Sequence, residues 1–297
     1  DINMAGNPIT LEYWNGDSWI IIVTGEANDG AYEWIVPGTD TVVDAKVRVT
    51  AVDRAGHSAS DQSDSVFTID SSDPVAVVEP LDPSTTNDAT PTFFGYAEDP
   101  VSPIVSADYR VDGGAWMAAI PVDDPFDSTL EVFTFTTPPL VDGFHIIQVR
   151  ATDAAGRVTS ADNYGSTTFT LDTGAPTVTI SVLSPDPTND ETPTFTGTAT
   201  DTAGTPIAYV QYRVDGSGWS YATPQDGAFD SYIENYTFTT TVLADGEHTV
   251  QVRAADAAGN VTAEANYASD TFKVDTTDPA VTLTSPTGGE FWAGHTT

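Results

Sequence analysis

The chain contains no cysteine among its 297 residues, so it can form neither a disulfide nor a thiolate metal site. Basic residues are scarce as well: 9 lysines and arginines stand against 44 aspartates and glutamates, for a formal net charge of −35. A field of that sign repels nucleic acid and anionic lipid and attracts cations. Long apolar runs are also missing, because no stretch reaches the roughly 18 residues that a membrane-spanning helix needs. We therefore predict no nucleic-acid binding and no membrane insertion in this segment.

What the sequence does contain is an internal repeat with a period of about 102 to 103 residues. Residues 109–113 (YRVDG) return as 212–216, and residues 149–156 (VRATDAAG) return as 252–259 (VRAADAAG). A weaker third copy lies upstream, at residues 47–56 (VRVTAVDRAG). A solenoid unit is only ~20–50 residues long, whereas about one hundred residues is the size of an independently folding domain. The repeat therefore predicts a series of domains.

Short segments rich in Val, Ile, Thr, Tyr and Phe alternate with Asp-Gly, Pro and Asn-Asp breakers, which is typical of a β-sandwich. In the two full copies we expect strands near 75–79, 91–97, 105–111, 115–119, 130–136, 144–152 and 166–171, and near 177–182, 193–199, 207–214, 218–222, 234–240, 247–255 and 270–274. Seven strands per ~100 residues is the immunoglobulin-like count. The proline-containing linkers 70–74, 172–176 and 275–279 are short and semi-rigid. We predict an all-β fold of tandem immunoglobulin-like β-sandwiches, arranged as an elongated rod.

These motifs resemble the tandem bacterial Ig-like repeats of large adhesins and cell-envelope filament proteins. The resemblance rests on the VRAxDAAG block, the DxxxP linkers and the openings at 86–92 (TNDATPT) and 188–194 (TNDETPT). It covers nearly the whole chain and implies an extracellular, cell-surface location. Such repeats act as spacers and in some cases as binding heads.

The two ends of the chain suggest a further relation. Residues 1–73 contain only later strands, near 9–13, 19–23, 32–36, 46–52 and 66–69, whereas residues 279–297 open another domain with segments 281–284 and 288–292. We expect an incomplete domain at 1–73, full domains at 74–175 and 176–278, and opening strands at 279–297. One interpretation is a window cut from a longer array. The other is that the tail of one protomer complements residues 1–73 of the next, which would propagate head to tail into a filament. Together these end segments fall about ten residues short of one period, which counts against perfect complementation.

The repeated aspartates are the candidate metal ligands. Three of them lie in hairpin turns and three in linkers: Asp53, Asp153 and Asp256 in the turns, and Asp70, Asp172 and Asp275 in the linkers. If the last two strands of a domain pair with each other, both sets come to the same end of that domain. Ca²⁺ takes six to eight hard oxygen ligands, and the resemblance to Ig-like adhesins implies Ca²⁺ at domain junctions. The alternative is that each aspartate only caps its turn through backbone amides. Further candidates are Asp88, Asp99, Asp190 and Asp201.

Other polar and aromatic residues favour structural roles. The four histidines, His57, His145, His248 and His295, show no metal-binding spacing, and no nucleophile elbow, Walker loop or dinucleotide fingerprint occurs. Asp127 and Asp230 could act in glycosidase-type acid–base chemistry, but their presence in both copies favours a loop-structuring role. Trp116 and Trp219 could stack on sugar rings or cover a sandwich edge. We predict no enzyme activity.

Together these observations predict an extracellular structural protein whose Ig-like repeats form or extend a cell-surface filament. Its expected partners are copies of itself, the cell envelope or another cell surface, and its expected ion is Ca²⁺. Two alternatives stay open: a Ca²⁺-stiffened stalk of a large adhesin, and a carbohydrate-binding accessory module of a secreted enzyme.

Overall fold

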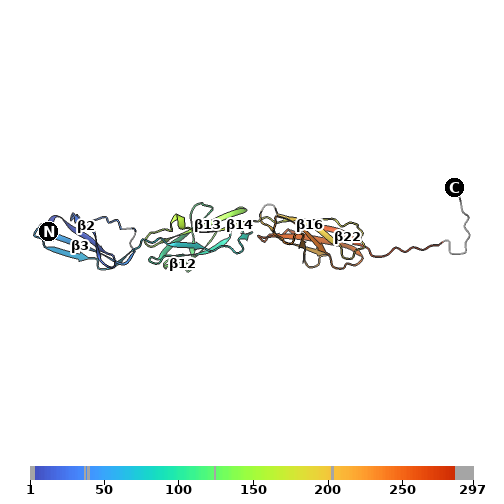
Figure 1. Cartoon of the computed structure of the whole chain (residues 1–297), viewed down its shortest axis with the longest axis horizontal. Coiled ribbons are helices and arrows are strands. Elements are labelled where there is room, and N and C mark those ends of the chain that lie inside the picture. Colours follow the sequence, from blue (N-terminus) through green and yellow to red (C-terminus); the bar gives the residue numbers. More distant parts are fainter. Residues whose placement is uncertain (1–3, 37, 39–40, 124, 202–203, 285–297) are drawn as a thin grey trace. The chain divides into compact units, whose positions relative to one another are not determined.

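The computed structural model describes residues 4–36, 38, 41–123, 125–201 and 204–284, which form β-strands and two three-residue 3₁₀ turns (Figure 1). They divide into two compact units, and each is described by itself. The first unit holds the residues up to Ser84 together with Asp88–Leu171, and the second holds Thr85–Asn87 together with the residues from Asp172 onward. No helix in the described part of the chain is long and apolar enough to cross a lipid bilayer.

Residues 75–84 and 88–171 of the first unit form a sandwich of two antiparallel sheets. One sheet has the order β11-β12-β8-β6, from Ile120–Pro121, Leu130–Thr136, Thr92–Glu98 and Val75–Val78. The other runs β10-β9-β13-β14, from Met117–Ala118, Ile104–Val111, Gly143–Asp153 and Gly165–Leu171, with the turn η1 at Ala161–Asn163. The core lies between the sheets and includes Phe93, Phe133 and Ile147.

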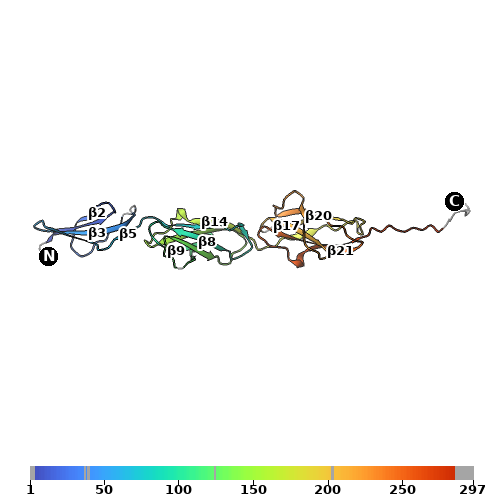
Figure 2. The ribbon, with the colours of Figure 1, turned by 90° about the horizontal axis from the view of Figure 1, so that it is seen from below.

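The second unit repeats this topology. Its sheets are β15-β16-β20-β19, from Thr177–Ile180, Thr194–Thr200, Ile233–Thr239 and Thr223–Pro224, and β18-β17-β21-β22, from Ser220–Tyr221, Ile207–Val214, Gly246–Asp256 and Ala268–Val274. The turn η2 is at Glu264–Asn266, and the short strand β7, Thr85–Thr86, is grouped with this unit. Figure 2 labels β17, β20 and β21 of the second unit. The all-β, Ig-like sandwich fold predicted from the alternating pattern is confirmed.

Alternation explains the packing of these strands. Along β8 and β12 every second residue is buried, as expected when side chains point to opposite faces of a sheet. A glycine is needed where the Phe133 ring lies against β8: a Cβ on Gly95 would lie 2.6 Å from that ring and 2.3 Å from the Val77 carbonyl oxygen. In the second unit, Gly197 and Tyr236 repeat this arrangement, and the Tyr236 hydroxyl donates to the Thr179 carbonyl oxygen at 2.7 Å.

Residues 4–69 form one antiparallel sheet. Its order is β2-β1-β3-β4, from Trp19–Glu26, Met4–Trp14, Val42–Asp53 and Ser58–Gln62, and β5 (Phe67–Ile69) also pairs with β3. Its buried core is small, with Tyr13, Val42, Ala45 and Ile69. This sheet corresponds to the β10-β9-β13-β14 sheet, because Arg48 pairs across to Glu12 on β1 as Arg150 pairs to Asp108 on β9.

The inner face of this sheet is open where its counterpart is covered. In that register Val47 matches Val149 and Val49 matches Ala151. Val47 and Val49 are 37% and 38% exposed, whereas Val149 and Ala151 are 0% and 1% exposed. The difference arises because β6, β8 and β12 cover the corresponding face in the sandwich, and residues 4–73 form no such second sheet within their described part.

The strand predictions need three corrections. Residues 32–36 were expected to form a strand but form none, and Ile35 is exposed, because the second sheet into which such a strand would pair is missing among the described residues of this segment. The single strands expected near 115–119 and 218–222 are each two short strands that pair with opposite sheets. Residues 281–284 lie in no strand, and segment 288–292 lies outside the described residues, as does His295.

The three hydrophobic clusters fall within the expected stretches 1–73, 74–175 and 176–278. The boundaries themselves, and the opening strands expected at 279–297, stay predictions.

Candidate functional site: two buried aspartate clusters

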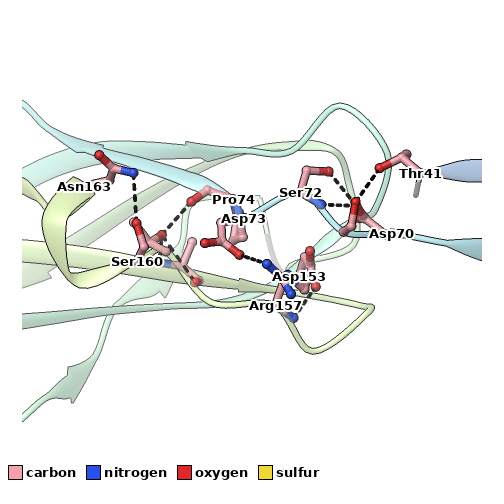
Figure 3. Close-up of polar contacts among 12 residues, drawn as sticks. Thr41, Asp70, Ser72, Asp73, Pro74, Asp153, Arg157, Ser160 and Asn163 are labelled. Atoms are coloured by element: carbon pink, nitrogen blue, oxygen red, sulfur yellow. Dashed lines mark hydrogen bonds and ion pairs between the residues drawn. The ribbon is translucent and has the colours of Figure 1, made fainter. Parts of the chain in front are cut away.

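Each unit gathers three aspartates whose carboxylate oxygens lie within 4.8 Å of one another. The first cluster contains Asp70, one residue past β5, Asp99, one residue past β8, and Asp153, the last residue of β13. The second cluster contains Asp172, Asp201 and Asp256, which occupy the matching positions in the repeat. Two aspartates of each cluster stand at strand ends of one sandwich, and the third comes from the linker that precedes the first strand of that sandwich. Figure 3 shows Asp70 and Asp153 of the first cluster near Asp73 and Arg157.

Turn chemistry uses only part of the first cluster. One oxygen of Asp99, Oδ1, accepts the backbone N–H groups of Val101 and Ser102 at 2.8 and 2.9 Å. Asp153 Oδ1 accepts the N–H of Arg157 at 2.8 Å. The other oxygen of each, Oδ2, is buried and has no hydrogen-bond partner among the described residues, and each side chain belongs to a residue that is 1% exposed. An unpartnered buried carboxylate oxygen is costly unless it meets a cation.

Both carboxylate oxygens of Asp70 accept hydrogen bonds. Its Oδ1 accepts the N–H of Ser72 at 2.9 Å and the hydroxyl of the same residue, and its Oδ2 accepts the hydroxyl of Ser102. In the second cluster Thr205 takes the place of Ser102, donating its hydroxyl to Asp172 Oδ2 at 2.8 Å. Gly204 packs so closely there that an added Cβ would lie 1.9 Å from the Asp172 carboxylate.

The pKa directions reflect this crowding. The pKa of Asp153 is raised, first by burial and then by the negative charges of Asp70 and Asp99. Burial also acts to raise the pKa of Asp70, but the hydroxyls of Ser102 and Ser72 and the charge of Arg157 outweigh it, so that this pKa is lowered. The first cluster therefore holds negative charge at the cost of repulsion, which a bound cation would remove.

The donor set fits a hard divalent cation. Each cluster offers three carboxylates with a side-chain hydroxyl close by, and hard oxygen atoms are the ligands that Ca²⁺ takes. No nitrogen or sulfur ligand belongs to either group, which argues against zinc.

Of the aspartates predicted from the sequence, Asp70 and Asp153 meet in one cluster and Asp172 and Asp256 in the other. The further candidates Asp99 and Asp201 complete the clusters.

The other candidates join neither group in the searched part of the chain. Asp53 accepts the N–H groups of Ala55 and His57, each at 2.8 Å, and contacts the His57 ring, whereas Asp275 pairs with Lys273. Asp88 and Asp190 each bind the N–H of the threonine two residues later.

The loop aspartates Asp127 and Asp230 belong to a repeated turn. The N–H groups of Asp127 and Ser128 donate to Glu131 Oε1 at 2.8 and 2.6 Å, and Glu234 repeats this contact in the second unit. Glu131 is buried, and sequence reasoning missed its role. The available signal was a glutamate recurring at the same distance after each Phe-Asp-Ser.

The repeated histidines pair with the repeated Asp-Gly turns. His145 Nδ1 lies 2.7 Å from Asp112 Oδ2, and its Nε2 lies 2.8 Å from the Val141 carbonyl oxygen. His248 repeats the arrangement with Asp215 and Ala244. Burial acts to lower the pKa of His145, but its two hydrogen bonds and the charge of Asp112 outweigh this effect, so that its pKa is raised.

The tryptophans contact arginines. The guanidinium groups of Arg110 and Arg150 lie 4.5 and 4.4 Å from the Trp116 ring centre, and Tyr164 packs against it edge-on. Arg213, Arg253 and Tyr267 surround Trp219 in the same way. These rings serve the chain's own packing, which weakens the sugar-stacking alternative.

A family match in the second unit agrees with the fold. Residues 184–276 match the family model of the bacterial Ig-like domain. No curated protein matches the chain. Among solved structures it is similar to fibronectin(III)-like modules of Clostridium thermocellum CbhA, with 17% identity, a TM-score of 0.38, and coverage of 67% of this chain and 94% of the other.

Two adhesin structures are similar as well. One is a 1.5-MDa bacterial ice-binding adhesin, at 17% identity and a TM-score of 0.36, covering 91% of this chain and 86% of the other. The second is a Ca²⁺-stabilized adhesin of an Antarctic bacterium, at 19% identity and a TM-score of 0.37, covering 94% of this chain and 68% of the other. At these scores neither likeness bears on the arrangement or function of this chain. The resemblance to bacterial Ig-like repeats, expected from the motifs, is confirmed by the family match at residues 184–276.

Proposed function

We propose that this chain is a non-catalytic structural protein of the cell exterior, whose Ig-like repeats build or extend a surface filament through contacts between copies. The observation that carries the proposal is the open inner face of the first sheet, where Val47 and Val49 are exposed although their counterparts are fully buried. An apolar sheet face of this kind favours a covering strand.

The chain itself indicates which strand fits. In both sandwiches the segment after the DxxxP linker becomes the first strand, β6 or β15, and places alternate residues in the core: Ala76 and Val78, or Val178 and Ile180. These strands pack against the last two long strands of their sandwich, β13 and β14 or β21 and β22. The counterparts in the first sheet are β3 and β4 with β5.

Residues 279–284 follow the third linker in the same register. Val281 matches Val178 and Leu283 matches Ile180, yet they are 90% and 74% exposed and lie in no strand. We take the occupant of the open face to be this segment of a second copy, entering as an added strand. Such a contact is head to tail, so it repeats from copy to copy and produces a filament.

Calcium is the proposed ion of both aspartate clusters. It would be held by Asp70, Asp99 and Asp153 in the first unit and by Asp172, Asp201 and Asp256 in the second. There it supplies positive charge that offsets the repulsion between buried carboxylates. A net charge of −35 also opposes association between copies, and divalent cations reduce that repulsion.

Negative-stain microscopy and light scattering of the full chain, with CaCl₂ or EDTA, test the filament. The wild type should form filaments, and V281D/L283D should remain monomeric, because aspartates at these positions cannot enter an apolar face. Thr282→Asp is the matched control on the opposite side of the segment and should still assemble. A monomeric wild type at all Ca²⁺ concentrations, or filaments of the double variant, would contradict the proposal.

A stalk segment of a large adhesin is the second candidate function, with the cell envelope or another cell surface as its partner. The buried aspartate clusters favour it, because bound Ca²⁺ would stiffen repeats in a stalk equally well. A monodisperse wild-type monomer whose unfolding temperature rises with Ca²⁺ would select the stalk over the filament.

A further inference from the structure

One of the positions that border the two aspartate clusters differs in charge within the hairpin itself. Four residues after the hairpin aspartate, the first unit has Arg157 and the second has Asn260. The backbone plays the same part in both, because the N–H of Arg157 donates to Asp153 Oδ1 at 2.8 Å and the N–H of Asn260 donates to Asp256 Oδ1 at 2.9 Å. Only the side chains differ in charge.

Asn260 is a neutral donor within its cluster. Its Nδ2 donates to Asp256 Oδ2 and to the Asp172 carbonyl oxygen, each at 2.8 Å. The side chain therefore orients two of the oxygens without supplying any positive charge.

Arg157 instead places a guanidinium beside the first cluster. Its Nη2 pairs with Asp73, as Figure 3 shows, whereas its Nε is buried without a hydrogen-bond partner among the described residues. This side chain lies next to the cluster, because the backbone N–H of the same residue donates to Asp153 Oδ1 at 2.8 Å and Figure 3 shows Arg157 beside Asp153. The first cluster therefore has a positively charged side chain, that of Arg157, beside it.

The first cluster also keeps room for an ion. The Oδ2 atoms of Asp99 and Asp153 are buried and accept no hydrogen bond from the described residues, so neither Arg157 nor the turns use them. The guanidinium offsets negative charge from a distance and leaves those ligand atoms available.

We propose that Arg157 is a built-in counter-ion that sets the Ca²⁺ affinity of the Asp70–Asp99–Asp153 cluster, holding it below the affinity that the same carboxylates have beside a neutral asparagine. This inference rests on the proposed binding of Ca²⁺. Its consequence is a first unit that takes up the ion only at a higher Ca²⁺ concentration and folds stably without it.

The test is a CaCl₂ titration of the ¹⁵N-labelled full chain in the V281D/L283D background, which keeps it monomeric for solution NMR. The amides of residues 102 and 157 report on the first cluster, and this background is the reference called wild type here. Arg157→Asn should lower the midpoint at the first cluster by about tenfold, since one unit charge close to a divalent ion changes binding by roughly that factor under solvent screening. Arg157→Lys keeps the charge and should stay near the wild-type midpoint. The Asn260 amide serves as the internal control and should not change.

A double variant separates two causes of the expected gain in Ca²⁺ affinity. R157N frees Asp73, which could itself become a ligand, whereas D73A/R157N leaves the alanine and asparagine that stand at the matching positions of the second unit, residues 175 and 260. The double variant should retain most of the gain. A return to the wild-type midpoint, or an unchanged midpoint in R157N, would overturn the role of Arg157 while leaving Ca²⁺ binding intact. No response of the wild-type first cluster at millimolar Ca²⁺ would overturn the calcium proposal itself.

Discussion

Replacing Asp153 by asparagine should reverse the effect of Ca²⁺ on the first unit. The substitution keeps an oxygen for the Arg157 N–H and puts an amide group in place of the unpartnered Oδ2. Without Ca²⁺, it removes one of three carboxylates that lie within 4.8 Å of one another, and the new amide can donate to a neighbouring carboxylate. With Ca²⁺, it removes a ligand.

The size of the effect follows from Coulomb's law. Two unit charges 4.8 Å apart repel by about 3.5 kcal/mol at an effective dielectric constant of about 20. Asp153 has two such neighbours, but the positive charge of Arg157 reduces the net repulsion. We expect D153N to stabilise the Ca²⁺-free first unit by about 2 kcal/mol, which raises the unfolding temperature of a unit of this size by about 4–8 °C. In saturating Ca²⁺ the wild type should be the more stable, because an ion at 100 times its dissociation constant contributes about 2.7 kcal/mol.

Differential scanning calorimetry of the full chain in EDTA and in CaCl₂ measures both halves of this prediction. Asp123→Asn is the matched control, since Asp123 is an exposed aspartate of the same unit, and it should leave both transitions unchanged. A D153N transition below that of the wild type in EDTA would refute the repulsion between the buried carboxylates. An unchanged order of stabilities in Ca²⁺ would refute the ligand role.

Three further predictions concern other parts of the fold. The pKa of His145 should lie above 6.5 in an NMR titration and should fall in D112N. Because the folded-state pKa is raised, the stabilisation from the His145–Asp112 pair is complete below pH 6.5 and is lost as the pH rises through the folded-state pKa. Gly204→Ala should destabilise the second unit by about 1–3 kcal/mol in urea unfolding, because its Cβ would overlap a carboxylate, whereas Gly218→Ala meets no atom within 4 Å and should be neutral. Trp116→Ala should cost the first unit about 1–2 kcal/mol by the same measurement, through loss of its two arginine contacts; an unchanged transition would show that the contacts contribute nothing.

Much of the fold could be predicted because its signals are local. Alternating apolar residues such as those of β8 and β12 mark strands with two faces, and Asp-Gly and proline mark their ends. The exception at residues 32–36 has a physical reason. Its composition is that of a strand, but a strand also needs a ladder partner, and the described part of this segment provides none.

The candidate site was predicted in part. Asp153 and Asp256 were recognised because they recur in the same turn, and the linkers supplied Asp70 and Asp172. Asp53 occupies the same kind of turn, yet within the described part of the chain its carboxylate binds its own hairpin, through Ala55 and His57, and joins neither cluster. Local pattern cannot separate these cases, because turn capping and ion binding use the same residue type.

By itself the sequence determined that this protein is a series of β-sandwiches, because a repeat of about one hundred residues with strand-length alternation has few other ways to bury its apolar side chains. It also determined the acidic character that favours cations. Only the tertiary structure decided that Asp99 lies beside Asp70 and Asp153, residues about 30 to 55 positions away in the chain. Which strand ends meet depends on the order of strands in both sheets, and that order is set by the packing of the whole core.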